Sequence, residues 1–138
     1  MAGYHLKEIL RGEIGHFSKV TEEFLEFCDA LEQKSNIMAL VELADLLGSI
    51  KLYLVKNGQG KEWEYIISVD NSPAVDAEEV KRAFNILNQD ISINDYKYFF
   101  NTLNCYLKNY HLGLNDLIIM SDITERVFLN GYRVSKTI

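Results

Sequence analysis

The segment from Ile37 to Leu47 constrains the fold of this chain more than any other. Glu42 and Asp45 are its only charged or polar residues, and the other nine are apolar or alanine. A helix that is apolar on nearly every side is normally buried in a protein core. An ionised carboxylate buried without a partner costs several kcal/mol. We therefore predict that Glu42 and Asp45 meet a cation, meet a basic side chain or have raised pKa values.

A second acidic pair precedes this segment. Glu23 and Glu26 are three positions apart, as are Glu42 and Asp45, and fifteen residues separate the two pairs. In a helix this spacing places both carboxylates on one face, about one turn apart. Taken alone, Glu23 and Glu26 with the neighbouring Glu22 are typical of a solvated helix face. The hypothesis of a shared site therefore depends on the two helices being neighbours.

Hydrophobic periodicity predicts that the chain is predominantly all-α, with a helical bundle at its centre. The first helix is expected from about His16 to Gln33 and the second from near Ile37 to Gly58. The short turn at 34–36, in which Ser or Asn caps the next helix, makes these two helices antiparallel neighbours. Further helices are expected at about 77–88, opened by a capping box at Asp76–Glu79; at 94–110, capped by Asn94-Asp95; and at 114–129.

The stretch after the second helix is harder to interpret. Asn57–Gly60 is a helix breaker, and Trp63–Val69 is rich in aromatic and β-branched residues. This composition allows a short β-strand, but no partner strand is evident in the sequence. Irregular packing of the aromatic side chains over the bundle is the alternative, and both possibilities stay open.

Composition limits the classes of function. A chain of 138 residues suits one domain. Its net charge of −6 argues against a nucleic-acid groove, but not against a nucleotide bound through divalent cations. Cys28 and Cys105, the only cysteines, lie among apolar residues and predict reduced thiols rather than a zinc site. No segment predicts a membrane span or a signal peptide, so we expect a cytoplasmic protein that does not bind membranes.

The four carboxylates favour a hard divalent cation. Oxygen ligands suit Mg²⁺ or Mn²⁺ better than Zn²⁺ or Cu²⁺. Such an ion can bridge phosphate oxygens and acidify a bound water. A di-iron bundle requires two Glu-x-x-His repeats, and Glu13–His16 supplies only one. His5 and His111 lack an evident partner and are predicted to be surface or packing residues.

The acidic pattern Glu22-Glu23-x-x-Glu26 followed by Glu42-x-x-Asp45 resembles the EExxE…ExxD signature of the MazG-like, all-α nucleoside triphosphate pyrophosphohydrolases. The surrounding residues are similar as well, and together the matches cover roughly half of the chain. They are Gly12-Glu13, Asp29-Ala30, the stretch from Glu42 to Gly48, and a C-terminal stretch from Leu114 to Arg133 that resembles the last helix of compact, phage-type members.

The resemblance implies a single domain over residues 1–138 that hydrolyses an NTP or dNTP between the α- and β-phosphates, with Mg²⁺ or Mn²⁺ as its cofactor. It implies a homodimer or homotetramer. Residues 59–103 would be an insertion within the domain. The implied metal ligands are Glu23, Glu26, Glu42 and Asp45, with Glu22 assisting the attacking water, and the candidate phosphate-binding residues are Arg133, Lys19 and Lys56.

Two other functions remain open at this point. The first is a regulatory protein of the same fold that binds a nucleotide without hydrolysing it. The second is a purely structural helical protein, for which replacing Glu42 or Asp45 by leucine would be neutral or stabilising even in Mg²⁺.

Overall fold

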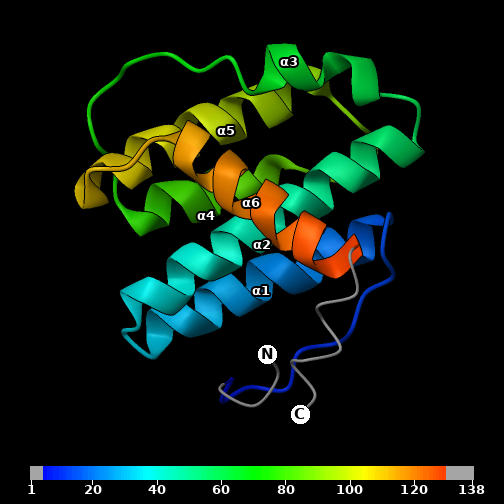
Figure 1. Cartoon of the computed structure of the whole chain (residues 1–138). Helices are drawn as coiled ribbons and strands as arrows, with labels where there is room; N and C mark the ends of the chain where they lie inside the picture. Colours follow the sequence, from blue (N-terminus) through cyan, green and yellow to red (C-terminus); the bar gives the residue numbers. More distant parts are fainter. Residues whose placement is uncertain (1–4, 130–138) are drawn as a thin grey trace. The chain divides into compact units, whose positions relative to one another are not determined.

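The computed structural model describes residues 5–129, with side chains as far as Ile123. Helices make up most of this part of the chain, and it contains no β-strand, so the predicted all-α class is confirmed (Figure 1). None of the helices between residues 5 and 129 is long and apolar enough to cross a membrane. The elements are α1 (Phe17–Glu32), α2 (Asn36–Lys56), η2 (Gly60–Glu62), α3 (Trp63–Ile66), α4 (Ala77–Ile86), α5 (Ile93–Leu107), η3 (Lys108–Tyr110) and α6 (Leu114–Leu129), where η denotes a short 3₁₀ segment.

The fold divides into two compact units. Of the described residues, the first comprises 5–53 and 117–129, and the second comprises 54–116. The long helix α2 therefore ends in the second unit, and α6 begins there. Every carboxylate of the predicted site belongs to the first unit.

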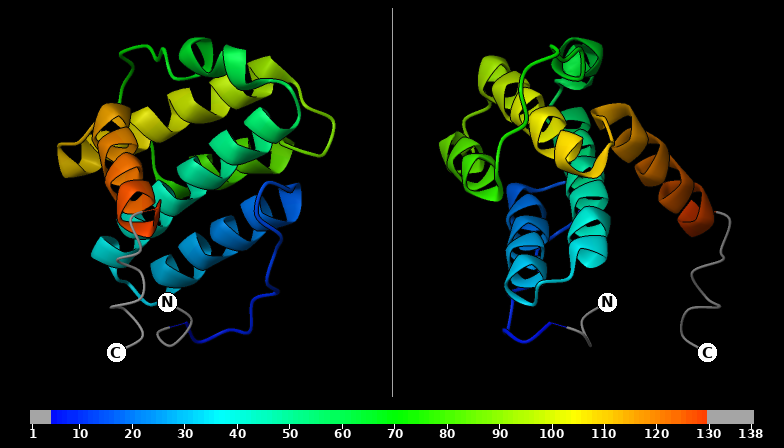
Figure 2. Two further views of the ribbon diagram at one scale, coloured as in Figure 1. Left: turned by 45° about the vertical axis from the view of Figure 1, so that its right-hand side comes forward. Right: turned by 90° about the vertical axis from the view of Figure 1, so that its left-hand side faces the viewer.

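Helices α1 and α2 form the antiparallel pair that the short turn predicts (Figure 2). Ser35 caps α2, since its hydroxyl accepts a hydrogen bond from the Met38 N–H at 3.3 Å. At the other end of the pair, the rings of Phe17 and Tyr53 meet with their centroids 5.6 Å apart. Both helices bury apolar side chains, among them Val20, Phe24 and Phe27 of α1 and Leu43, Leu46 and Leu47 of α2.

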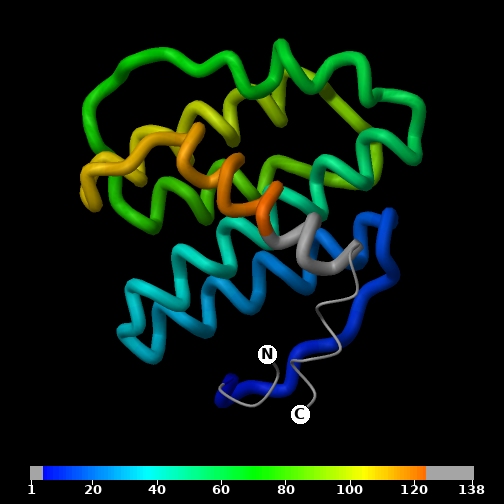
Figure 3. Tube along the Cα trace, in the orientation of Figure 1, coloured from blue at the N-terminus to red at the C-terminus, as the bar shows by residue number. Residues whose placement is uncertain are grey.

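Ahead of α1, the chain is not helical. Residues 5–13, the N-terminal segment, run antiparallel to α1 along its surface (Figure 3). Three backbone N–H groups of the segment donate hydrogen bonds to side chains of α1 in this antiparallel order. The Leu6 N–H donates to Asp29 at 3.2 Å, the Gly12 N–H to Glu22 at 2.7 Å, and the Glu13 N–H to the Ser18 hydroxyl at 3.0 Å.

The second unit has an aromatic core. Phe99 of α5 packs edge-on against Phe84 of α4 at 5.7 Å between ring centroids, and Phe100 packs in the same manner against Trp63 at 5.5 Å. The unit contains the whole of residues 59–103, the stretch that the resemblance identifies as an insertion. Whether this stretch is an insertion within a single domain stays a prediction.

The structure differs from the sequence analysis at two places in the second unit. The stretch 63–69, for which a short strand and irregular aromatic packing both stayed open, is helical over Trp63–Ile66. The described residues contain no strand, so an extended segment here would leave its backbone groups without a ladder partner. The N-cap of α5 is Ser92 rather than Asn94 or Asp95, and its side chain makes no capping hydrogen bond. The predicted cap of α4 is confirmed, because Asp76 accepts a hydrogen bond from the Glu79 N–H at 3.1 Å.

Candidate metal site

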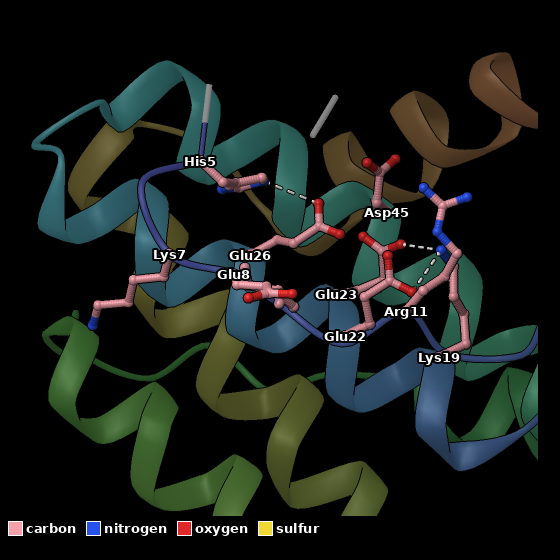
Figure 4. A pocket seen from close by; sticks show the side chains of 10 residues that line it. His5, Lys7, Glu8, Arg11, Lys19, Glu22, Glu23, Glu26 and Asp45 are labelled. Carbon is pink, nitrogen blue, oxygen red and sulfur yellow. Dashed lines mark hydrogen bonds and ion pairs between the residues drawn. The ribbon is translucent and has the colours of Figure 1, made fainter. Parts of the chain in front are cut away.

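Carboxylates from α1 and α2 converge in the first unit. Oxygens of Glu23, Glu42 and Asp45 lie within 4.8 Å of one another, and a second set within that distance combines Glu23 with Glu22 and Glu26. The structure thus brings together all four predicted metal ligands, together with the predicted assisting residue. A pocket of about 410 Å³ lies beside them, lined by the N-terminal segment, by α1 and by Asp45 (Figure 4).

Two of these carboxylates are deeply buried. Glu42 is 2% exposed, as its apolar surroundings in the sequence indicate, and Glu23 is 6% exposed. The burial of Glu23 differs from the solvated helix face that the first acidic cluster suggests on its own. The N-terminal segment lies along this side of α1: its Gly12 N–H donates to Glu22, and its residues line the same pocket as Glu23.

The carboxylates resist being ionised together. Burial raises the pKa of Glu26 to about 9, and the neighbouring Glu42 and Glu23 add to this rise. Burial and the negative charges of Glu23 and Glu42 raise the pKa of Asp45 to about 7. The pKa of Glu23 is also raised by burial, although Lys19 opposes the shift. Without a cation, the site therefore holds protons at neutral pH.

His5 lies among these carboxylates. Its Nε2 is 3.1 Å from a carboxylate oxygen of Glu26 and 3.1 Å from one of Glu42, while its Nδ1 is 2.7 Å from Asp29. Its side chain is only 5% exposed. The prediction that His5 is a surface or packing residue without a partner is wrong. His111 is exposed, which agrees with the first of the two roles predicted for it.

Asp29 holds His5 from the side opposite the cluster. It is 2% exposed, and its Oδ2 also accepts hydrogen bonds from the Leu6 N–H and from the Gln33 side chain at 2.9 Å. Burial acts to raise the pKa of Asp29, but the hydrogen bonds from His5, Gln33 and Leu6 outweigh it and lower the pKa below its ordinary value. Asp29 is therefore an ionised acceptor near neutral pH.

Glu22 and Lys19 form the flank of the pocket. The Lys19 ammonium lies 3.2 Å from Glu22 and 2.9 Å from Glu23. Burial acts to raise the pKa of Glu22, but the hydrogen bonds from the Gly12 N–H and Lys19 outweigh it and lower the pKa. Glu22 is thus ionised near neutral pH, close to carboxylates whose pKa values are raised.

The predicted phosphate-binding residues that the structure describes differ in whether they line the pocket. Lys19 lines the pocket. Lys56 is an exposed residue of the second unit and does not line the pocket, and Arg133 lies outside the described residues. Lys7 and Arg11, which the sequence did not single out, also line the pocket.

Gly12 allows the N-terminal segment to approach α1. A Cβ atom at this position would lie 2.3 Å from the backbone carbonyl of Ser18 and 2.4 Å from the Lys19 nitrogen. We expect Gly12→Ala to lower the free energy of unfolding by about 1–3 kcal/mol, because the backbone must shift to accept the methyl group. Urea denaturation measures this change. Gly113→Ala is the control, since its Cβ would meet only an ordinary contact at 3.4 Å, and an equal loss in both variants would contradict the expectation.

Comparison of the chain with protein-family models, with curated proteins and with solved structures finds no significant match.

Proposed function

We propose that this protein is a Mg²⁺-dependent nucleotide pyrophosphohydrolase of the MazG-like type, which cleaves an NTP or dNTP into a nucleoside monophosphate and pyrophosphate. The observation that supports the proposal is the convergence of Glu23, Glu26, Glu42 and Asp45 beside one pocket. Their spacing in the sequence resembles the EExxE…ExxD signature, and the resemblance supplies the reaction.

The chemistry of the site fits a divalent cation. One carboxylate oxygen of the buried Glu23 has no hydrogen-bond donor among the described residues, although the other accepts from Lys19. Burial and the neighbouring carboxylates raise the pKa values of Glu26 and Asp45, so full ionisation of the cluster is unfavourable without added positive charge. A cation that binds there would replace protons and satisfy the unpaired oxygen. The donor set is mostly carboxylate oxygen, which suits Mg²⁺ or Mn²⁺.

Each residue has a role in this proposal. The four carboxylates hold the cation, which when bound supplies positive charge to the phosphate oxygens and acidifies a coordinated water. Glu22 is ionised, and the Gly12 N–H fixes one of its oxygens, so Glu22 can accept the proton of the attacking water. Lys19 and Arg11 line the same pocket and supply positive charge for the phosphates.

The reaction is a hydrolysis of a phosphoric anhydride. The oxygen of water forms a new bond to the α-phosphorus, and the bond from that phosphorus to the α–β bridging oxygen breaks. Pyrophosphate leaves with the electron pair of the broken bond, and Glu22 accepts the water proton. No redox change or additional reactant is needed.

The direct test measures pyrophosphate release from canonical and modified NTPs and dNTPs by the purified protein with Mg²⁺. We expect release from at least one nucleotide and none when a chelator is present. Folded protein that binds no divalent cation by calorimetry would overturn the proposal. Nucleotide binding without pyrophosphate release would indicate the regulatory alternative. Light scattering in the same buffer measures whether the protein is the homodimer or homotetramer that the resemblance implies.

A further inference from the structure

His5 lies close to two of the proposed metal ligands, and a site of four carboxylates alone does not explain this position. Its Nε2 lies at the same distance, 3.1 Å, from oxygens of Glu26 and Glu42, and the three ligand atoms all lie within 4.8 Å of one another. Adjacent ligands of a six-coordinate ion with bonds of about 2.1 Å are separated by about 3.0 Å. The nitrogen is thus at the distance of an adjacent ligand from each of the two oxygens.

The far side of the imidazole is arranged as it is in metal-binding histidines. A histidine that binds a metal usually donates its other ring N–H to a carboxylate or carbonyl, which orients the ring. Asp29 lies 2.7 Å from Nδ1 and is itself held by the Leu6 N–H and by Gln33. A proton on Nδ1 directs the Nε2 lone pair toward the two glutamates.

An independent observation in the same pocket also points to a cation. Glu23 is more than nine-tenths buried, and its Oε2 has no hydrogen-bond partner among the described residues. Glu23 and His5 line the same pocket (Figure 4). Glu42 belongs both to the ligand set with His5 and to the set with Glu23 and Asp45. Glu26 likewise belongs to the set with His5 and to another set with Glu23, so the histidine and Glu23 share two neighbouring carboxylates.

We infer that His5 is a nitrogen ligand of this site, and that His5, Glu26 and Glu42 bind a transition-metal ion of the Mn²⁺ class more tightly than Mg²⁺. Mg²⁺ prefers oxygen ligands, whereas imidazole nitrogen favours the first-row transition metals. The inference shares with the proposed function the assumption that the pocket holds a cation. It requires no hydrolysis and no nucleotide.

The test uses the full-length protein with Mn²⁺ alone. Electron spin echo spectroscopy of the bound Mn²⁺ detects the magnetic coupling of a directly bound imidazole nitrogen. We expect this coupling in the wild type and its loss in His5→Gln, with Mn²⁺ affinity at least about tenfold weaker and Mg²⁺ affinity changed much less. The matched control is His16→Gln, which removes an exposed imidazole of the same unit and should change neither quantity.

Asp29→Asn provides a second test, which asks whether Asp29 orients the His5 ring. Asparagine has a similar shape but lacks the charge that favours the Nδ1–H, so we expect the nitrogen coupling to persist and Mn²⁺ affinity to fall about 10–100-fold. Circular dichroism checks that each variant is folded. If His5→Gln does not fold, the electron spin echo spectrum of Mn²⁺ bound to the wild type still shows whether an imidazole nitrogen binds the ion.

The possible failures are distinguishable. Mn²⁺ that binds to the wild type without nitrogen coupling would overturn the role of His5, because the cation would then displace the imidazole. That result would leave the proposed hydrolysis intact. A protein that binds neither Mn²⁺ nor Mg²⁺ would overturn both this inference and the proposed function.

Discussion

Replacing Glu42 by glutamine should abolish the Mg²⁺-dependent release of pyrophosphate. Glu42 is 2% exposed, and it belongs both to the ligand set with His5 and Glu26 and to the set with Glu23 and Asp45. Glutamine keeps the size of the side chain but removes the charge that a cation needs. Because residues that merely orient metal ligands already cost about 10–100-fold when they are changed, the loss of a ligand should lower kcat/KM by at least about 100-fold. Initial rates of pyrophosphate release measure the change.

The matched control is Glu64→Gln, an exposed glutamate of the second unit whose loss should leave the rate unchanged. Full activity in Glu42→Gln would contradict the proposed ligand set.

Glu42→Leu separates the proposed hydrolytic function from the purely structural alternative. If Glu42 binds a cation, Mg²⁺ should raise the melting temperature of the wild type but not that of the leucine variant. Equal responses to Mg²⁺ in both proteins would favour the structural alternative.

The parts of the site that the sequence predicted are those that depend on local signals. The apolar periodicity of α1 and α2 and the short turn between them determine that the two helices are antiparallel neighbours. That arrangement is sufficient to bring Glu23 and Glu26 close to Glu42 and Asp45. The burial of Glu42 could also be predicted, because its apolar neighbours in the sequence place that whole stretch of α2 in the core.

The parts that were missed depend on the N-terminal segment. His5 and Arg11 lie in residues 5–13, where apolar residues at positions 6, 9 and 10 recur at helical spacing and allow a short amphipathic helix, but the structure has no helix there. The contact between His5 and Glu42 spans 37 positions in the sequence, and no motif connects them. Gly12 was the one available signal of this contact, because a glycine before a helix can mark a close approach of two backbones.

The helix over Trp63–Ile66 was missed for another reason. Its aromatic and β-branched composition favours a strand, but the described part of the chain contains no strand to pair with it.

The stability of the metal-free protein should fall as the pH rises from about 5 to about 9. Glu26 in the unfolded chain ionises near its ordinary pKa of 4.5, whereas the folded protein keeps this proton until about pH 9 because of burial and of the neighbouring Glu42 and Glu23. Asp45 behaves in the same way between 3.8 and about 7. Between these values the folded state binds more protons than the unfolded state, so the free energy of unfolding decreases with increasing pH.

A divalent cation should remove most of this dependence, because it replaces the protons that the folded site otherwise has to hold. Melting temperatures measured across this pH range, in a chelator and in excess Mg²⁺, test both statements. Glu26→Gln should reduce the pH dependence in the chelator, since the amide does not ionise, while the exposed Glu64→Gln should leave it unchanged. A stability that rises with pH in the chelator would contradict the raised pKa values of Glu26 and Asp45. A dependence that excess Mg²⁺ leaves unaltered would mean that these carboxylates keep their protons when Mg²⁺ is present, and would exclude them as ligands of the proposed metal site.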